Sequence, residues 1–203
     1  MAWLGLAWLG LAWSSQAFAG DWTPLLKSMK NGCAMHDITT GNNALNIPAN
    51  LKKDIVSNKR SGEHSTITLK NATAFGKSIT KIQAKLPDTS ELSSVKVYFA
   101  DGNFTNIRSQ FSVELGDKKY PANKYGIWSL NDSYVATAIN EAKFKQLQQH
   151  AKAHDGDYGS GVVSVLQINQ KGWRLGTVDE MDGGTRTTSL TFDSTNKTIE
   201  CVF

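Results

Sequence analysis

Hydrophobic and polar residues alternate in short runs along most of the chain beyond residue 60. In the run 92–100, Val95, Val97 and Phe99 fall on one side and polar residues fall between them. A period of two residues indicates half-buried β-strands. We expect about eight or nine strands among the runs 64–70, 79–86, 92–100, 104–115, 125–130, 134–139, 162–168, 173–178, 187–192 and 198–203.

Turn-forming residues separate several of these runs. Asp101-Gly102 predicts a hairpin that returns as the run 104–115, and residues 116–124 then form a polar loop. Two further hairpins are expected around residues 170–172 and 193–197. Strands joined in this way predict a predominantly antiparallel sheet rather than a wound parallel one.

Three segments carry helical patterns. Thr23-Pro24 offers a cap and a first-turn proline for a short helix that Asn31-Gly32 would end. Residues 48–57 predict a second small helix. The clearest helix is expected at 141–153, where Phe144, Leu147 and Ala151 share one face. One clear helix, one or two short ones and many strands together predict the α+β class.

The first nineteen residues resemble a secretory leader. The stretch from Ala2 to Trp13 is apolar, and Ala17-Phe18-Ala19 forms a small-residue cleavage site before Gly20. No Lys or Arg precedes the apolar stretch, which departs from the usual leader pattern. We expect residues 1–19 to be a removed signal peptide and residues 20–203 to be a single exported domain, periplasmic or secreted. A buried N-terminal helix is the alternative.

The two cysteines, Cys33 and Cys201, lie near the two ends of the expected mature chain. A lone pair of cysteines in an exported protein usually forms one disulfide bond, and we expect that bond here. Two unpaired thiols are the alternative.

Charge is unevenly distributed, although the whole chain carries a net charge of +4. Residues 20–86 carry +6 and residues 87–203 carry −2. The basic first part favours an acidic partner or an anionic surface. No nucleic-acid motif accompanies these charges, so we expect no nucleic-acid partner, and we expect no membrane-spanning segment in the mature chain.

Motifs for catalysis or metal binding are weak. His150 and His154 share a helix face, but no glutamate lies between them, and we expect no metal and no cofactor. Ser160, which a catalytic triad would combine with His64, lies in a glycine loop that follows a helix and precedes a strand, the reverse of a nucleophile elbow. The carboxylates of residues 179–184 lack the spacing of a calcium loop.

Aromatic residues are the remaining candidates for binding. Tryptophan and tyrosine are common anchors of interfaces. We select Tyr125, Trp128, Tyr158 and Trp173 as candidate binding residues, with a role in the core as the alternative for each.

The sequence favours an exported, periplasmic, non-enzymatic protein that binds another protein or a cell-envelope macromolecule. An inhibitor or immunity protein against a cell-wall enzyme or toxin fits this description. The first alternative is a hydrolase with its site in the 150–160 region. The second is a small-ligand carrier.

Overall fold

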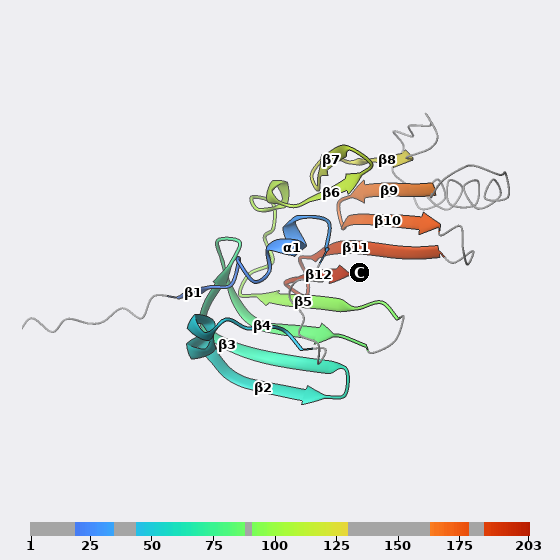
Figure 1. The fold of residues 1–203 in the computed structure, drawn as a ribbon. Coiled ribbons are helices and arrows are strands. Elements are labelled where there is room, and N and C mark those ends of the chain that lie inside the picture. Colours follow the sequence, from blue (N-terminus) through green and yellow to red (C-terminus); the bar gives the residue numbers. More distant parts are fainter. Residues whose placement is uncertain (1–18, 35–43, 88–90, 130–162, 179–184) are drawn as a thin grey trace, which may run out of the picture.

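One large β-sheet dominates the structure (Figure 1). The computed structural model describes residues 19–34, 44–87, 91–129, 163–178 and 185–203. Within them, the large sheet contains β1 (Gly20–Asp21), β2 (Ile55–Ser61), β3 (His64–Ala74), β4 (Lys77–Lys85), β5 (Ser94–Phe99), β8 (Gly126–Ser129), β9 (Val163–Asn169), β10 (Gly172–Val178), β11 (Thr185–Asp193) and β12 (Thr198–Val202). A separate hairpin contains β6 (Ser112–Leu115) and β7 (Lys118–Pro121). The predicted β-rich class is confirmed.

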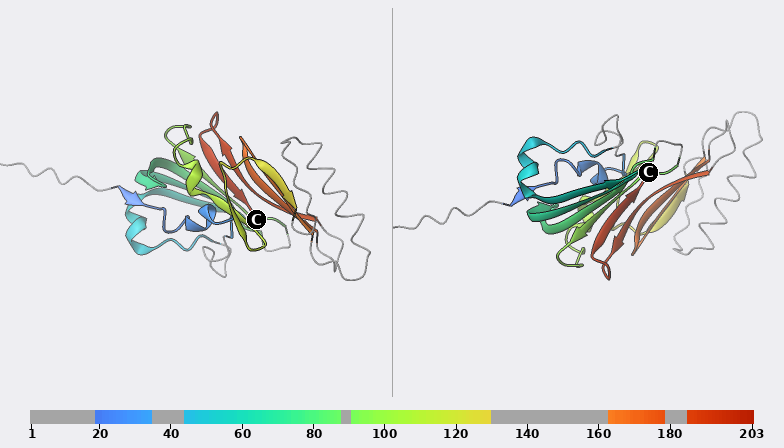
Figure 2. Two further views of the ribbon diagram at one scale, coloured as in Figure 1. Left: turned by 90° about the horizontal axis from the view of Figure 1, so that it is seen from above. Right: turned by 90° about the horizontal axis from the view of Figure 1, so that it is seen from below.

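The strand that comes last in chain order lies in the middle of the large sheet. The order is β1-β3-β4-β5-β12-β11-β10-β9-β8, and β2 pairs with β3 beside β1. Of these pairings, β1 with β3 is parallel and the others are antiparallel. β12 therefore joins two groups of strands, β1–β5 and β8–β11. Figure 2 shows the two groups at a clear angle to each other, as the twist of β-sheets requires.

One face of this sheet is covered, and its side chains form the core. Val95, Cys201 and Leu190 lie directly opposite one another on adjacent strands, and all three are fully buried. The helix α1 (Lys27–Lys30) lies against this face (Figures 1 and 2), and Leu26 and Met29 are fully buried there. We call this side of the sheet the covered face.

Aromatic packing completes the cover. Phe111, which precedes β6, is fully buried, and its ring centroid lies 4.9 Å from that of Phe75 and 5.2 Å from that of Phe192. On the β6–β7 hairpin, Tyr120 packs against Trp128 of β8 with a centroid distance of 4.7 Å. Burying side chains of this kind contributes about 1.5–3 kcal/mol each, so this cluster holds the hairpin to the sheet.

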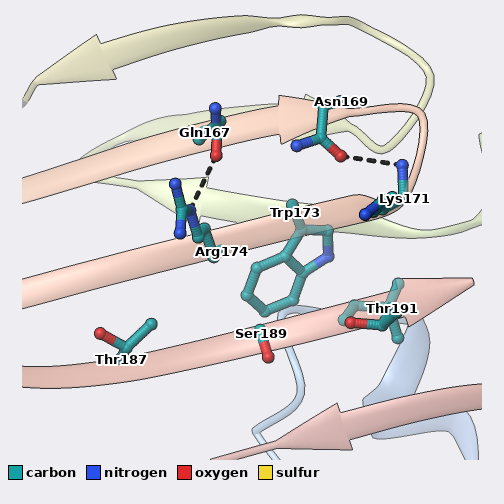
Figure 3. Close-up of a pocket in the computed structure, with 10 residues that line it drawn as sticks. Gln167, Asn169, Lys171, Trp173, Arg174, Thr187, Ser189 and Thr191 are labelled. Atoms are coloured by element: carbon teal, nitrogen blue, oxygen red, sulfur yellow. Dashed lines mark hydrogen bonds between the residues drawn. The ribbon is translucent and has the colours of Figure 1, made fainter. Parts of the chain in front are cut away.

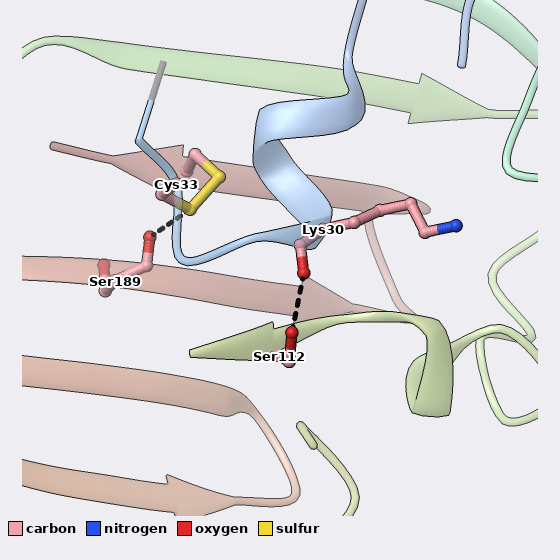
Figure 4. The surroundings of a disulfide bond; sticks show 5 residues. Lys30, Cys33, Ser112 and Ser189 are labelled. Carbon is pink, nitrogen blue, oxygen red and sulfur yellow. Dashed lines mark hydrogen bonds between the residues drawn. A yellow bond between two sulfur atoms is a disulfide. The ribbon is translucent and has the colours of Figure 1, made fainter. Parts of the chain in front are cut away.

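A disulfide bond between Cys33 and Cys201 ties the segment after α1 to β12 (Figure 4). The two Cα atoms lie 5.6 Å apart and the residues are separated by 168 positions in the sequence. Beside this bond, the Gly32 amide donates to the Ser112 carbonyl at 2.8 Å, and the Ser112 hydroxyl donates to the Lys30 carbonyl at 3.2 Å. The predicted bond is confirmed, which excludes the alternative of two unpaired thiols.

The first helix differs from its prediction. α1 begins at Lys27, after a series of turns, and Thr23 does not cap it. The Thr23 hydroxyl oxygen instead accepts a hydrogen bond from the Phe75 amide at 2.7 Å. Because Phe75 lies far from Thr23 in the sequence, the local pattern could not show this hydrogen bond and suggested a helix cap instead.

The prediction of a helix at 48–57 is wrong beyond residue 54. A 3-10 helix, η2 (Ala49–Asp54), is followed directly by β2. β2 pairs with β3 and carries mainly polar, exposed residues, because it is an edge strand and buries little of its surface. Without an alternating pattern, the sequence did not reveal it. The predicted helix at 141–153 and the predicted strand at 134–139 lie outside the described residues.

The hairpin predicted from β5 into 104–115 is also wrong. β5 pairs with β4 and β12, and the chain after it turns into the 3-10 helix η3 (Arg108–Gln110). Phe104, Ile107 and Phe111 are buried at the spacing of helical turns rather than at every second residue. The predicted polar loop at 116–124 contains β7, which pairs with β6 in a separate hairpin.

None of the helices in the described residues is long and apolar enough to cross a membrane.

Candidate binding surface

The second face of the large sheet carries mostly polar side chains from β3 to β10, whereas Ile127 of β8 and Val165 of β9 are buried on it. Because side chains alternate along a strand, the neighbours of each core residue point to this opposite side. We call this side the open face. One row of residues crosses seven strands of this face, each directly opposite the next: Thr66, Gln83, Lys96, Glu200, Thr191, Gly172 and Asn169. With neighbouring strands about 4.8 Å apart, this row extends over roughly 30 Å.

A shallow cavity of about 260 Å³ lies at one end of this row, over β9, β10 and β11 (Figure 3). Its floor is at Gly172, which has no side chain. The Gly172 φ angle is +140°, and a Cβ added there would lie 1.8 Å from the Leu190 carbonyl oxygen. Glycine is therefore required at this position, because any side chain would collide with the backbone of β11.

The walls of this first cavity carry amides, hydroxyls and two cations. The Arg174 Nε donates to the Gln167 Oε1 at 2.7 Å, and Gln167 is 2% exposed, which fixes the guanidinium over the sheet (Figure 3). Lys171, Ser189 and Thr191 also line the cavity. None of the ten lining residues is an Asp or Glu, so the cavity suits a ligand that carries negative charge and accepts hydrogen bonds.

A second cavity of about 230 Å³ lies at the other end of the row, over β3, β4, β5 and β12. Gln83, Lys85, Lys96 and Glu200 line it, and the Lys96 ammonium forms an ion pair with the Glu200 carboxylate at 3.0 Å. The Tyr98 hydroxyl donates a hydrogen bond to the Gln83 side chain. The two cavities therefore share one face, and Glu200 and Thr191 stand opposite each other between them.

Lys85, one of the two lysines that line the second cavity, forms an ion pair at its rim. The Lys85 ammonium donates to the Glu91 carboxylate at 2.7 Å. This hydrogen bond and the opposite charge raise the pKa of Lys85 and lower the pKa of Glu91. The rim is therefore charged throughout the physiological pH range.

Three of the four candidate binding residues lie in the described part of the chain. Tyr125 is 45% exposed, Trp128 packs against Tyr120, and Trp173 is 3% exposed on the covered face. The indole Nε1 of Trp173 is buried without a hydrogen-bond partner in the described residues. Tyr158 lies outside them. Trp173 also lines the first cavity, but Tyr125 and Trp128 do not, so the three described residues do not form one site there.

Arg108 links the segment around Ala122 to the turn between β9 and β10. Its guanidinium donates to the backbone carbonyls of Ala122, Asn169 and Gln170, and so holds the β9–β10 turn. It also lies 5.4 Å from the Tyr125 ring centroid. Burial lowers the pKa of Arg108, although the group remains a cation at physiological pH.

Candidate catalytic and metal-binding residues give no assembled centre in the described residues. His64 lies at the rim of the second cavity. His150, His154, Ser160 and residues 179–184 lie outside the described residues. Within the part that is described, no three His, Cys, Asp or Glu side chains are grouped so that they would hold a metal ion.

Apart from Trp173 in the first cavity and His64 in the second, sequence reasoning missed the residues of both cavities. Gln167, Arg174, Ser189 and Thr191 occupy the polar positions of strands that the sequence did predict. The register between strands, which the alternation does not give, is needed to see that they form one surface. Searches against protein-family models, curated proteins and solved structures found no match for this chain.

Proposed function

We propose that this protein is exported and acts as a non-enzymatic binding protein of the cell envelope, with the open face as its binding surface. The leader-like residues 1–19 support export, and the Cys33–Cys201 bond is compatible with an oxidising compartment. The partner that this surface fits is an extended polymer that is rich in hydroxyl groups and carries carboxylates, which is the chemistry of an acidic glycan.

The observation that carries this proposal is the shared placement of the two cavities. Both lie on one polar face, and a single row of side chains, roughly 30 Å long, connects them. The described cavities have volumes of about 230–270 Å³, below the usual range of about 300–1,000 Å³ for sites that enclose a small molecule. An extended ligand fits this shape better than a carried small molecule.

Charge decides the class of polymer. Lys171 and Arg174 line the first cavity, and no Asp or Glu lines it. In the second cavity Lys85 pairs with Glu91 and Lys96 pairs with Glu200, so it is the first cavity that favours a negatively charged ligand. Guanidinium and ammonium groups bind carboxylates through charge-assisted hydrogen bonds. The hydroxyl and amide groups between them match the hydroxyl groups of a sugar chain.

Binding to a soluble polyuronic acid tests the proposal. Isothermal titration calorimetry of residues 20–203 with polygalacturonate, and with the same polymer after reduction of its carboxyl groups, is expected to show binding to the acidic form. Arg174→Gln removes one charged donor and is expected to weaken this binding about tenfold. Lys118→Gln, an equal change of charge on the exposed β7, is the matched control and is expected to leave binding unchanged.

Equal binding of both polymers, or of neither, would contradict the proposed ligand. An inhibitor or immunity protein against a cell-wall enzyme or toxin would have a protein partner. If Arg174→Gln instead abolished capture of one envelope protein while polygalacturonate did not bind, the open face would be a protein-binding surface and the glycan proposal would be wrong.

A further inference from the structure

Asp54, at the end of η2, is a buried carboxylate that the proposed binding surface does not use. It is 3% exposed, and its Oδ2 accepts a hydrogen bond from the Trp22 indole at 3.1 Å. In the described residues, no Lys or Arg forms an ion pair with it. A neutral acceptor such as an amide would serve the indole equally well, whereas burying a charge without a partner is costly. A cation close to Asp54 would therefore stabilise its carboxylate.

The neighbour of this carboxylate is Gly20. A Cβ added at Gly20 would lie 1.7 Å from Asp54 Oδ2, so any larger residue would collide with it. From the standard geometry of a residue, the Gly20 nitrogen then lies within about 4 Å of the same oxygen. Gly20 is buried, and the preceding Ala19 is exposed.

The chain around Gly20 is held firmly in place. Its carbonyl accepts a hydrogen bond from the Thr73 hydroxyl at 3.3 Å, and two residues later the Trp22 amide donates to the Thr73 carbonyl at 2.7 Å. β1 pairs with β3 through Gly20 and Ala72. The position of the Gly20 nitrogen is thus fixed by the sheet.

We propose that Asp54 is the counter-ion of a new N-terminus at Gly20, which is created when residues 1–19 are removed. This inference rests on the proposed export of the chain. Hydrolysis of the Ala19–Gly20 peptide bond releases residues 1–19 with a carboxylate at Ala19 and leaves an α-amino group on Gly20. That group is protonated at neutral pH, carries three N–H donors and stands next to Asp54. Processing therefore places a positive charge beside the buried negative one.

Four versions of the protein test this pairing. Two begin at Gly20 and two begin at Ala19, and each start is made with Asp54 and with Asp54→Asn. Adding Ala19 moves the ammonium about 3.8 Å along the chain. With Asp54, we expect the protein that begins at Gly20 to have a folding equilibrium constant about tenfold larger than the one that begins at Ala19. With Asp54→Asn, we expect the two starts to be equal.

Asp21→Asn is the matched control, because Asp21 is an exposed carboxylate on the same strand. It is expected to retain the full difference between the two starts. A difference of less than twofold with Asp54, or one that persists in Asp54→Asn, would overturn the pairing and leave Asp54 as an acceptor for Trp22. Chemical denaturation followed by the fluorescence of Trp22, Trp128 and Trp173 measures these constants.

The N-terminus of the exported protein supplies an independent readout. Full-length chain is expressed in a bacterial host, and the periplasmic product is examined by intact mass and N-terminal sequencing. Gly20 is expected as its first residue. Cleavage at another bond would overturn the inference while export stands, whereas an intact Met1 in the cytoplasm would refute export itself.

Discussion

The covered and the open face of the large sheet are built from the same strands and yet have opposite characters. On β11, Leu190 is fully buried on the covered face, opposite Cys201 of the disulfide bond. Its neighbours Ser189 and Thr191 lie on the open face and line the first cavity. The covered face buries apolar side chains and so supplies the stability of the fold. Over β10, β11 and β12 the open face buries less apolar surface and carries polar side chains such as Ser189 and Thr191. The comparison teaches that the buried core and the proposed binding surface are separated here by a single step along a strand.

Removing the disulfide bond is expected to have the largest effect on the covered face. In the double variant Cys33→Ala and Cys201→Ala, a loop closed over 168 residues is released. The chain-entropy model then predicts a loss of about 5 kcal/mol in the free energy of unfolding. Urea denaturation of the variant and of the oxidised wild type measures it, with the reduced wild type as control. Equal midpoints for all three would show that the bond contributes no stability.

Substitutions at two adjacent residues of β11 sharpen the contrast between the faces. Leu190→Ala is expected to cost about 2–5 kcal/mol because it leaves a void in the core. Ser189→Ala, on the open face, is expected to change the free energy of unfolding by less than about 0.5 kcal/mol. The same denaturation experiment measures both. Comparable losses would mean that the open face also stabilises the fold.

A substitution of Arg108 tests how the segment that contains η3 is attached to the β9–β10 turn of the large sheet. Arg108→Lys keeps the charge but loses the fork of N–H donors that reaches the carbonyls of Ala122, Asn169 and Gln170. We expect a loss of about 1–3 kcal/mol in the free energy of unfolding. Hydrogen exchange should show faster exchange confined to the β9–β10 turn. Unchanged exchange at Lys171 would argue against this role.

The smallest expected effect concerns the turn between β11 and β12. Hydrogen bonds from the backbone and side-chain amides of Asn196 lower the pKa of Asp193. A lowered pKa means that folding favours the carboxylate, so its contribution is present above the pKa of the unfolded chain and is lost as pH falls through the folded pKa. Wild type should therefore lose stability faster than Asp193→Asn between about pH 5 and pH 3. Parallel curves for the two proteins would refute this.

Local patterns predicted the strands that bury one face and pair with a sequence neighbour. Val163–Asn169 returns as Gly172–Val178, and Thr185–Asp193 returns as Thr198–Val202, close to the ranges expected from alternation and turn residues. The disulfide bond followed from the number of cysteines and the expected compartment. These features depend on composition or on residues that are near in the chain.

Features that depend on distant partners could not be predicted in this way. The pairing of β12 with β5 joins Cys201 to Val95, and nothing in either strand specifies the other. β2 lacks apolar alternation because it lies at an edge. The two cavities of the open face also depend on distant partners, because the register of seven strands brings their residues together and no sequence motif does.

The central place of β12 delays the completion of the large sheet. Residues 198–202 are made after the other strands that the structure describes, yet they join β5 to β11 in the sheet. Until these residues emerge from the ribosome, the chain therefore consists of two incomplete half-sheets, each with an unpaired edge that is open to aggregation. Assembly by such non-local pairing is slow. A chaperone that shields β5 and β11 until residues 198–202 are available would therefore raise the yield of native protein.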